Sequence, residues 1–135
     1  MTHEPLSRPH IFFAAVLLLL MALLAGGGAR RESVTIDEVA HVGAGVSYLQ
    51  KLDMRMNLEH PPLAKVLAAL PLALRGVRAD YAGFAWSFGS SGFNSLLGEW
   101  SFGHAVITRW NDPVRTMAWA RAPMLLLTLL LGFVL

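Results

Sequence analysis

Two things are scarce in this chain: cysteine is absent, and only 15% of the 135 residues are Asp, Glu, Lys or Arg. The absence of cysteine excludes a disulfide framework and a zinc site built on thiolates. A soluble domain carries about 25% charged residues, so this deficit, with 55% hydrophobic residues, indicates a membrane protein. The net charge of +2 comes from scattered basic residues, a pattern that argues against nucleic acid as a partner.

Two apolar runs are candidates for membrane helices. Residues 11–29 carry no charge and are long enough to cross a hydrocarbon core about 30 Å thick. Residues 122–135 fall short of the roughly 20 apolar residues that a span needs. We therefore expect the second run to be the first part of a transmembrane helix that is cut off at residue 135, rather than a short apolar tail.

The first run also has features of a cleaved signal peptide, because small residues at 26–29 follow it. A retained anchor is favoured for two reasons. Arg8 is the single Lys or Arg before the run, and the run is longer than the usual signal-peptide core of roughly 7–15 residues. The charges flanking the run do not decide its orientation, because the segment that follows exceeds the roughly 60 residues over which the positive-inside rule works.

Residues 36–52 are predicted to form a helix. Their apolar residues recur near the helical period, and Thr35 with Glu38 three positions later matches a capping box. On this helix one face would carry Asp37, His41, Gly45 and Tyr48. Two interpretations stay open: a functional face, or the solvated polar stripe of a plain amphipathic helix.

A connector at 53–60 precedes a second predicted helix at 61–74. Pro61 and Pro62 suit a first helical turn, where a missing N–H costs nothing, and Pro71 should kink or end the helix. The segment is too short to span a bilayer. We expect Lys65, the charged residue in this apolar stretch, to extend its ammonium toward lipid headgroups.

Residues 75–110 read as turn-rich and aromatic. Trp86 and Trp100 each begin a Trp-Ser-Phe-Gly sequence, which is typical of a membrane–water boundary and less often of a sugar-stacking platform. Glu99 and His104 are interpreted as surface or interfacial groups. Residues 111–113 should cap the last helix, which starts near residue 114.

Arg121 stands at the start of the second apolar run. Its guanidinium either reaches the membrane interface or pairs with an acidic partner, and reaching the interface is the more common outcome.

Acidic residues occur in two places that can support chemistry. Asp37 and Glu38 are adjacent, so on a helix their side chains point about 100° apart. One of them can act as a general base while the other organises the backbone, an arginine or a metal. Glu59 lies at the start of the second helix and approaches Asp37 if the two helices pack antiparallel. With His41 or His60 these carboxylates could also bind a divalent cation.

Spacing alone makes these signals weak. The sequence contains no compact zinc motif, no phosphate-binding loop and no serine nucleophile elbow.

The order of these elements resembles the amino-terminal portion of the membrane-embedded C-type glycosyltransferases that use polyprenyl-phosphate sugars. Protein O-mannosyltransferases and the lipid A aminoarabinose transferases belong to this group. The likeness covers nearly the whole chain. The residues that carry it are Asp37, Glu38, His41, Gly45, Tyr48, Glu59, His60, Pro61, Pro62, Leu63, Lys65, the two Trp-Ser-Phe-Gly sequences, Asn111, Asp112 and Arg121.

The resemblance implies an all-α membrane protein, in the inner membrane of a bacterium, with its main loop extracytoplasmic. A cytoplasmic amino terminus at 1–10 would precede a transmembrane helix at 11–29. The extracytoplasmic loop would span 30–113 and carry the two amphipathic helices near 36–52 and 61–74. Residues 114–135 would begin a second transmembrane helix, truncated here.

The resemblance also implies roles for single residues. Asp37 would be the catalytic base, Glu38 would support the loop, and Glu59 would face the same cavity. The expected substrate-binding residues are His41, His60, Tyr48 and Arg121.

The donor would be an undecaprenyl- or dolichyl-phosphate sugar, and the acceptor a protein or a lipid. The resemblance implies a divalent metal in some members, for which Asp37, Glu59 and His60 would be the candidate ligands.

Length is the departure from this pattern. Members of the group have around a dozen membrane helices, and their carboxy-terminal region contacts the donor phosphate. We therefore expect this chain to be inactive by itself and to form part of a larger enzyme. The alternative is a short membrane-anchored binding or assembly protein without catalytic activity.

Overall fold

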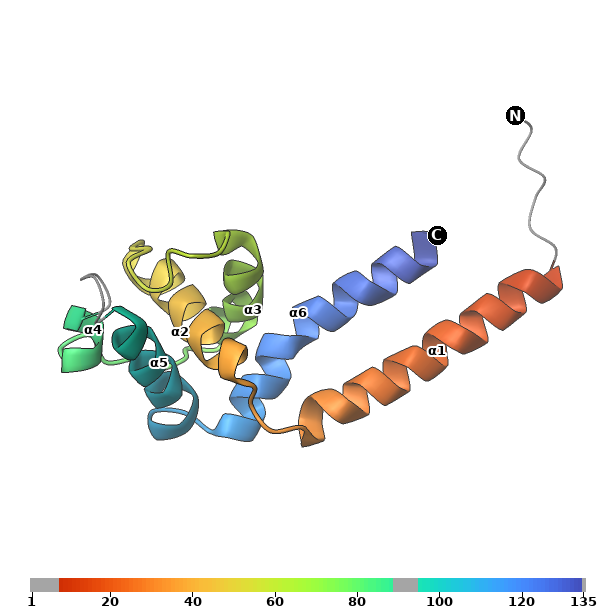
Figure 1. Ribbon diagram of the computed structural model, residues 1–135. Helices are drawn as coiled ribbons and strands as arrows, with labels where there is room; N and C mark the ends of the chain where they lie inside the picture. Colours follow the sequence, from red (N-terminus) through yellow and green to blue (C-terminus); the bar gives the residue numbers. More distant parts are fainter. Residues whose placement is uncertain (1–7, 89–94, 135) are drawn as a thin grey trace, which may run out of the picture.

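The computed structural model describes residues 8–88 and 95–134, which form helices joined by turns and loops and contain no β-strand. Parts of the expected amino terminus (1–7), Gly89 of the first Trp-Ser-Phe-Gly sequence and Leu135 lie outside the described residues. Two long helices extend from one side of a domain of shorter helices (Figure 1). In chain order the elements are α1 (Arg8–Arg31), α2 (Ile36–Lys51), α3 (Pro62–Leu74), α4 (Phe84–Phe88), α5 (Ser95–His104), η2 (Ala105–Arg109) and α6 (Pro113–Val134).

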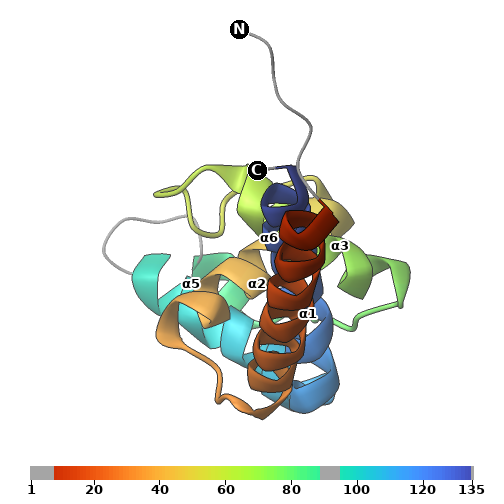
Figure 2. The same cartoon turned by 90° about the vertical axis from the view of Figure 1, so that its right-hand side faces the viewer.

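The long helices α1 and α6 form an antiparallel pair. Both are long and apolar enough to cross a membrane, by length and composition. They run side by side in both ribbon views, and the start of α1 and the end of α6 lie away from the helical domain (Figures 1 and 2). Gly132 lets the helices approach, because a Cβ there would lie 2.6 Å from a methyl group of Leu18. Small residues have this role where membrane helices pack closely.

The second apolar helix begins where the sequence predicts. The predicted cap is confirmed: α6 begins at Pro113, and the Arg115 N–H donates to the Asp112 carboxylate at 2.7 Å. The helix has 22 residues and is long and apolar enough to cross a membrane, because it includes residues before the apolar run at 122–135. Its apolar run was underestimated because Arg121 was taken as a boundary, whereas the helix passes through that residue.

The two amphipathic helices form where the sequence predicts them, as α2 and α3. The capping box at the start of α2 is confirmed, with the Glu38 N–H bonded to the Thr35 hydroxyl and the Glu38 carboxylate bonded to the Thr35 N–H. The helix α2 ends at Lys51, and its C-cap residue Leu52 adopts a left-handed conformation (φ 54°). Pro71 lies inside α3 and does not end it.

The segment 75–110 is more helical than expected. Its helices α4, α5 and η2 were missed because the segment is rich in glycine and aromatic residues, which carry weak helical signals. Trp86 packs inside the domain against Tyr81 and Phe102, with ring centroids 4.9 and 5.7 Å away. Phe102 is fully buried and also contacts Trp110. Trp86 is partly buried in this aromatic cluster, and its predicted position at a membrane boundary stays a prediction.

Glycines set how closely α2 crosses its neighbours. A Cβ on Gly103 of α5 would lie 1.9 Å from the carbonyl oxygen of Val39, and one on Gly43 would meet the Gly103 backbone at 2.5 Å. On the other side of α2, a Cβ on Gly45 would lie 2.1 Å from the Lys65 carbonyl oxygen. Both crossings are backbone contacts, so no side-chain movement can make room. The helix α2 is therefore the centre of the domain.

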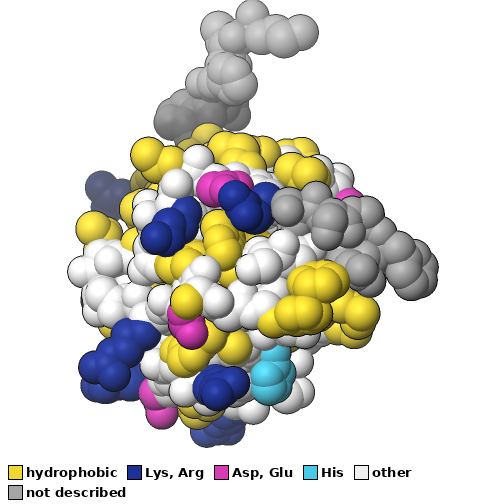
Figure 3. Space-filling model, turned by 90° about the vertical axis from the view of Figure 1, so that its left-hand side faces the viewer, with side chains coloured by type: hydrophobic (Ala, Val, Ile, Leu, Met, Phe, Trp, Pro, Cys, Tyr) yellow, Lys and Arg dark blue, Asp and Glu magenta, His cyan; other side chains and the backbone are white. Residues whose placement is uncertain are grey.

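The face of the domain opposite the two long helices carries charges of both signs between apolar side chains (Figure 3). Its Lys and Arg side chains are spread over the visible surface rather than gathered in one patch. This distribution agrees with the scattered basic residues of the sequence.

Candidate functional site

Glu38 of α2 and Arg121 of α6 form a bidentate ion pair. The Arg121 Nε donates to one Glu38 carboxylate oxygen at 2.6 Å, and Nη2 donates to the other at 2.7 Å. This geometry is the strong, bidentate form of an arginine–carboxylate pair. The bonds from Arg121 are the largest cause that lowers the pKa of Glu38, and the Thr35 contacts act in the same direction.

The remaining donors of Arg121 bind the chain between α1 and α2. Its Nη1 donates to the carbonyl oxygens of Ala29 and Glu32 at 2.9 and 3.1 Å, and its Nη2 donates to that of Ser33 at 3.0 Å. All five N–H groups of the guanidinium thus have acceptors within the chain. Pairing with an acidic partner, rather than reaching the interface, is the outcome for this arginine. A substrate phosphate would have to displace one of these bonds.

Asp37 is in a different environment from its neighbour. Its carboxylate is exposed, and it accepts no hydrogen bond from the residues that the structure describes. It lies one helical turn before His41 and close enough to influence the charge of that imidazole. Of the two adjacent carboxylates, Glu38 is occupied by structural contacts and Asp37 is available to a ligand.

His41 and His60 meet across the gap between α2 and the start of α3. Their ring centroids are 5.3 Å apart in an edge-on contact. His41 is half-buried, and this burial, followed by the charges of Lys65 and His60, lowers the pKa of its imidazole. His60 and the preceding Glu59 are exposed. The structure thus aligns Asp37, His41 and His60 along one open edge, with Glu59 beside it.

Behind this edge lies a buried polar cluster that sequence reasoning missed. Lys65 is only 1% exposed, and its ammonium donates to the carbonyl oxygens of Asn57 and His60 at 2.6 and 2.7 Å. The expectation that Lys65 extends to lipid headgroups is wrong. The Tyr48 hydroxyl donates to the carbonyl oxygens of Met56 and Asn57. Together these groups hold the connector between α2 and α3 against the helices.

Glu99 reaches the same cluster from α5. It is 5% exposed, so its interpretation as a surface group is wrong. Burial raises the pKa of its carboxyl, while a hydrogen bond from Asn57 and the charge of Lys65 act in the opposite direction. The side-chain oxygen of Asn57 is buried without a hydrogen-bond partner among the described residues.

The helical period of the sequence could have predicted that Lys65 and Glu99 are buried. Lys65 shares a helical face with the buried residues Ala69 and Leu72, at spacings of four and seven. Glu99 precedes the buried Phe102 by three positions in the same way. The charges of the two side chains suggested solvent, whereas their helical positions placed them in the core.

The expected metal ligands do not converge. Among the described residues, no three His, Asp or Glu side chains are gathered closely enough to hold a metal ion. Glu59 and His60 are neighbours in sequence, whereas Asp37 is connected to them through His41, whose ring contacts that of His60. The expectation of a divalent metal stays a prediction.

Searches among protein-family models, curated proteins and solved structures find no match for this chain.

Proposed function

We propose that this chain is the amino-terminal part of an integral-membrane glycosyltransferase that uses a polyprenyl-phosphate sugar. The helices α1 and α6 would cross the bilayer, and the domain between them would lie on the extracytoplasmic side. The open edge with Asp37, His41, His60 and Glu59 would receive a protein or lipid acceptor. The observation that carries this proposal is the difference between two adjacent carboxylates: Asp37 is exposed, whereas Glu38 is bound by Arg121 and Thr35.

In the proposed reaction Asp37 takes the proton of an acceptor hydroxyl or amine. The freed electron pair attacks the anomeric carbon of the donor sugar, whose bond to the phosphate oxygen breaks, and polyprenyl phosphate leaves. A base for this step must be exposed and available, as Asp37 is. Glu38 could not serve without giving up Arg121 and the cap of α2.

The groups next to Asp37 support an acceptor-binding role. The uncharged form of His41, favoured by its burial, can donate or accept a hydrogen bond. His60 and Glu59 offer further polar contacts at the start of α3. Tyr48 lies deeper and binds backbone carbonyls, so its contribution would be to shape the connector. Arg121 would likewise fix the position of α2 rather than touch the substrate.

The test is sugar transfer by the complete protein in its native membrane. Membranes receive a polyprenyl-phosphate donor with a labelled sugar, and label in protein or lipid acceptors is measured. We expect Asp37→Asn to lower the rate by about 10²-fold or more, the contribution typical of a general base. Asp53→Asn is the matched control, because Asp53 pairs with Arg55 on the connector, and this variant should retain transfer.

The alternative is a membrane-anchored binding or assembly protein. It is favoured by the extent to which Arg121 and Lys65 are satisfied within the chain, as in a purely structural domain. Label that stays on the donor, in wild type and variants alike, would support this alternative and contradict the enzyme proposal.

A further inference from the structure

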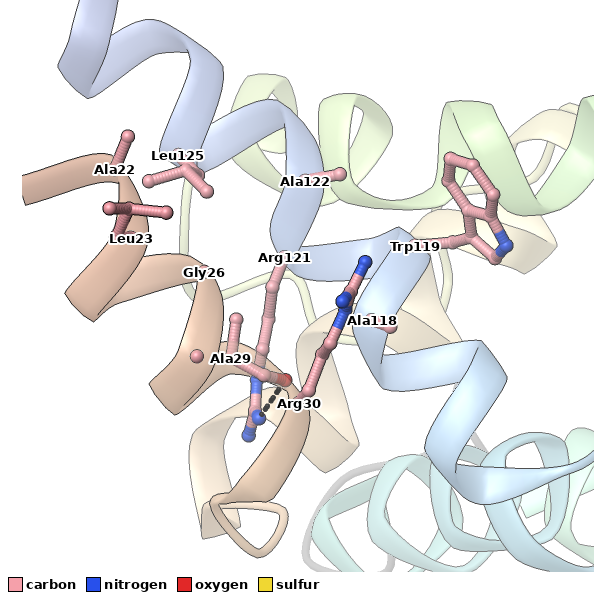
Figure 4. Close-up of a pocket in the computed structure, with 11 residues that line it drawn as sticks. Ala22, Leu23, Gly26, Ala29, Arg30, Ala118, Trp119, Arg121, Ala122 and Leu125 are labelled. Carbon is pink, nitrogen blue, oxygen red and sulfur yellow. Dashed lines mark hydrogen bonds between the residues drawn. The ribbon is translucent and has the colours of Figure 1, made fainter. Parts of the chain in front are cut away.

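An open groove lies between α1 and α6 at the level where α1 ends (Figure 4). Its volume is about 480 Å³, within the range of roughly 300–1,000 Å³ found for small-molecule sites. The groove has a polar end near Arg30 and an apolar end near Leu23 and Leu125.

The polar end carries an arginine whose charge is not compensated. Figure 4 shows Arg121 and Arg30 pointing in opposite directions, with Arg121 toward Ala29 and Arg30 toward Ala118 of α6. Arg121 is neutralised by Glu38, whereas Arg30 makes no hydrogen bond or ion pair with the described residues. The groove lining includes no carboxylate. Its polar end is therefore complementary to an anion.

Trp119 lines the groove beside this charge. The Arg75 guanidinium carbon lies 3.4 Å from the centre of the Trp119 ring and restrains it from the α3 side. The indole is partly exposed, and tryptophan favours the level of lipid headgroups. This position marks the polar end of the groove as the membrane boundary.

The apolar end continues onto the surface that α1 would present to lipid. Leu23 is 65% exposed although it lines the groove, and Leu20 and Leu24 beside it are also exposed. An acyl chain could pass along Leu23 and Leu125 without leaving the bilayer. A water-soluble anion would leave this part of the groove unfilled.

We propose that the groove binds one anionic, two-chain phospholipid of the surrounding membrane. Its phosphate would pair with Arg30 next to Trp119, and one acyl chain would lie along Leu23 and Leu125. Basic pockets between transmembrane helices recognise anionic headgroups in this way. The bound lipid would fill the space between α1 and α6 and steady their packing. This inference does not rest on the proposed sugar transfer.

The test is native mass spectrometry of the complete protein released from vesicles of phosphatidylcholine and phosphatidylglycerol. We expect wild type to retain phosphatidylglycerol selectively, and Arg30→Gln to bind it about tenfold more weakly, as for the loss of one charged hydrogen bond. Arg31→Gln is the matched control, because Arg31 carries the same charge on the next residue and does not line the groove. It should retain the lipid.

A second variant tests the volume of the groove and leaves its charge unchanged. A Cβ on Gly27, which lines the groove, would meet no atom within 4 Å, so Gly27→Leu can fill the space without a clash at its Cβ. Leucine also favours the helix more than glycine does. We expect this variant to fold and to lose the bound lipid.

Three outcomes would overturn the proposal. Equal losses in Arg30→Gln and Arg31→Gln would indicate diffuse attraction to a charged surface. Displacement of the lipid by inorganic phosphate alone would indicate a simple ion site. Full retention of phosphatidylglycerol by Gly27→Leu would place the lipid outside the groove.

Discussion

Asp37 and Glu38 show how neighbouring residues of the same chemical type acquire different tasks. The helix turns about 100° between them, which directs Glu38 toward Arg121 and leaves Asp37 exposed. The adjacency of the two carboxylates was visible in the sequence, and so was the capping box. The identity of the arginine partner was not, because it lies 83 residues away.

The ion pair between Glu38 and Arg121 should make the free energy of unfolding depend on pH. Folding lowers the pKa of Glu38 below its ordinary 4.5, so the pair stabilises fully above that pH and loses its effect as the pH falls through the folded-state pKa. We expect Glu38→Gln to cost about 2 kcal/mol near neutral pH. Thermal unfolding midpoints of the two proteins, measured from about pH 7 to about pH 3, should converge on acidification. A gap that stays constant with pH would contradict this role.

Lys65 should stabilise the backbone of the connector between α2 and α3. Lys65→Met removes the bonds to the carbonyl oxygens of Asn57 and His60, and leaves the Asn57 oxygen with the Tyr48 hydroxyl as its donor. We expect backbone amides of 53–60 to exchange hydrogen about tenfold faster. Lys51→Met is the control, since Lys51 is exposed and contacts the face of the Tyr81 ring. Equal exchange in both variants would show that the buried ammonium does not hold the connector.

At the scale of helices, local sequence signals determine some elements and tertiary contacts determine others. The bounds of α2 and α3 followed from a capping box and a proline pair, which act within a few residues. The helices α5 and η2 have no comparable signal, and they form where Gly103 and Phe102 pack on α2. Their burial of Glu99 depends on that packing and could not be read from composition.

The glycine crossing of α2 and α5 should tolerate no side chain. In Gly103→Ala the new methyl group would lie 1.9 Å from the Val39 carbonyl oxygen, so the helices must separate. We expect a loss of several kcal/mol or failure to accumulate, because the obstacle is backbone. Gly27→Ala is the control, since its methyl group enters open space. Equal thermal unfolding midpoints for both variants would contradict the packing described for α5.

The whole molecule is a helical domain carried at one end of two long apolar helices (Figures 1 and 2). The helical signals at 11–29, 36–52 and 61–74, together with the family resemblance, predicted this all-helical plan. The antiparallel pairing of α1 with α6 depended on contacts such as Gly132 with Leu18, which lie too far apart in sequence to be predicted from local pattern. The compartment that the domain faces stays a prediction, which needs a separate test.

Orientation can be measured directly because the chain has no cysteine. We expect Ala82→Cys, at an exposed position of the domain, to react with a membrane-impermeant maleimide on intact cells. Arg8→Cys, at the start of α1, should react only after the membrane is opened. The reverse pattern would place the domain in the cytoplasm.

The central claim, that Asp37 acts in catalysis while Glu38 acts in structure, is tested most directly by one paired measurement. Sugar transfer by Asp37→Asn and Glu38→Gln is measured in the complete protein and compared at equal amounts of folded protein. The expected result is a loss of about 10²-fold or more for Asp37→Asn at an unchanged unfolding midpoint, and a lowered midpoint with largely retained specific activity for Glu38→Gln. Transfer that survives in Asp37→Asn, or is lost per folded molecule only in Glu38→Gln, would contradict the account.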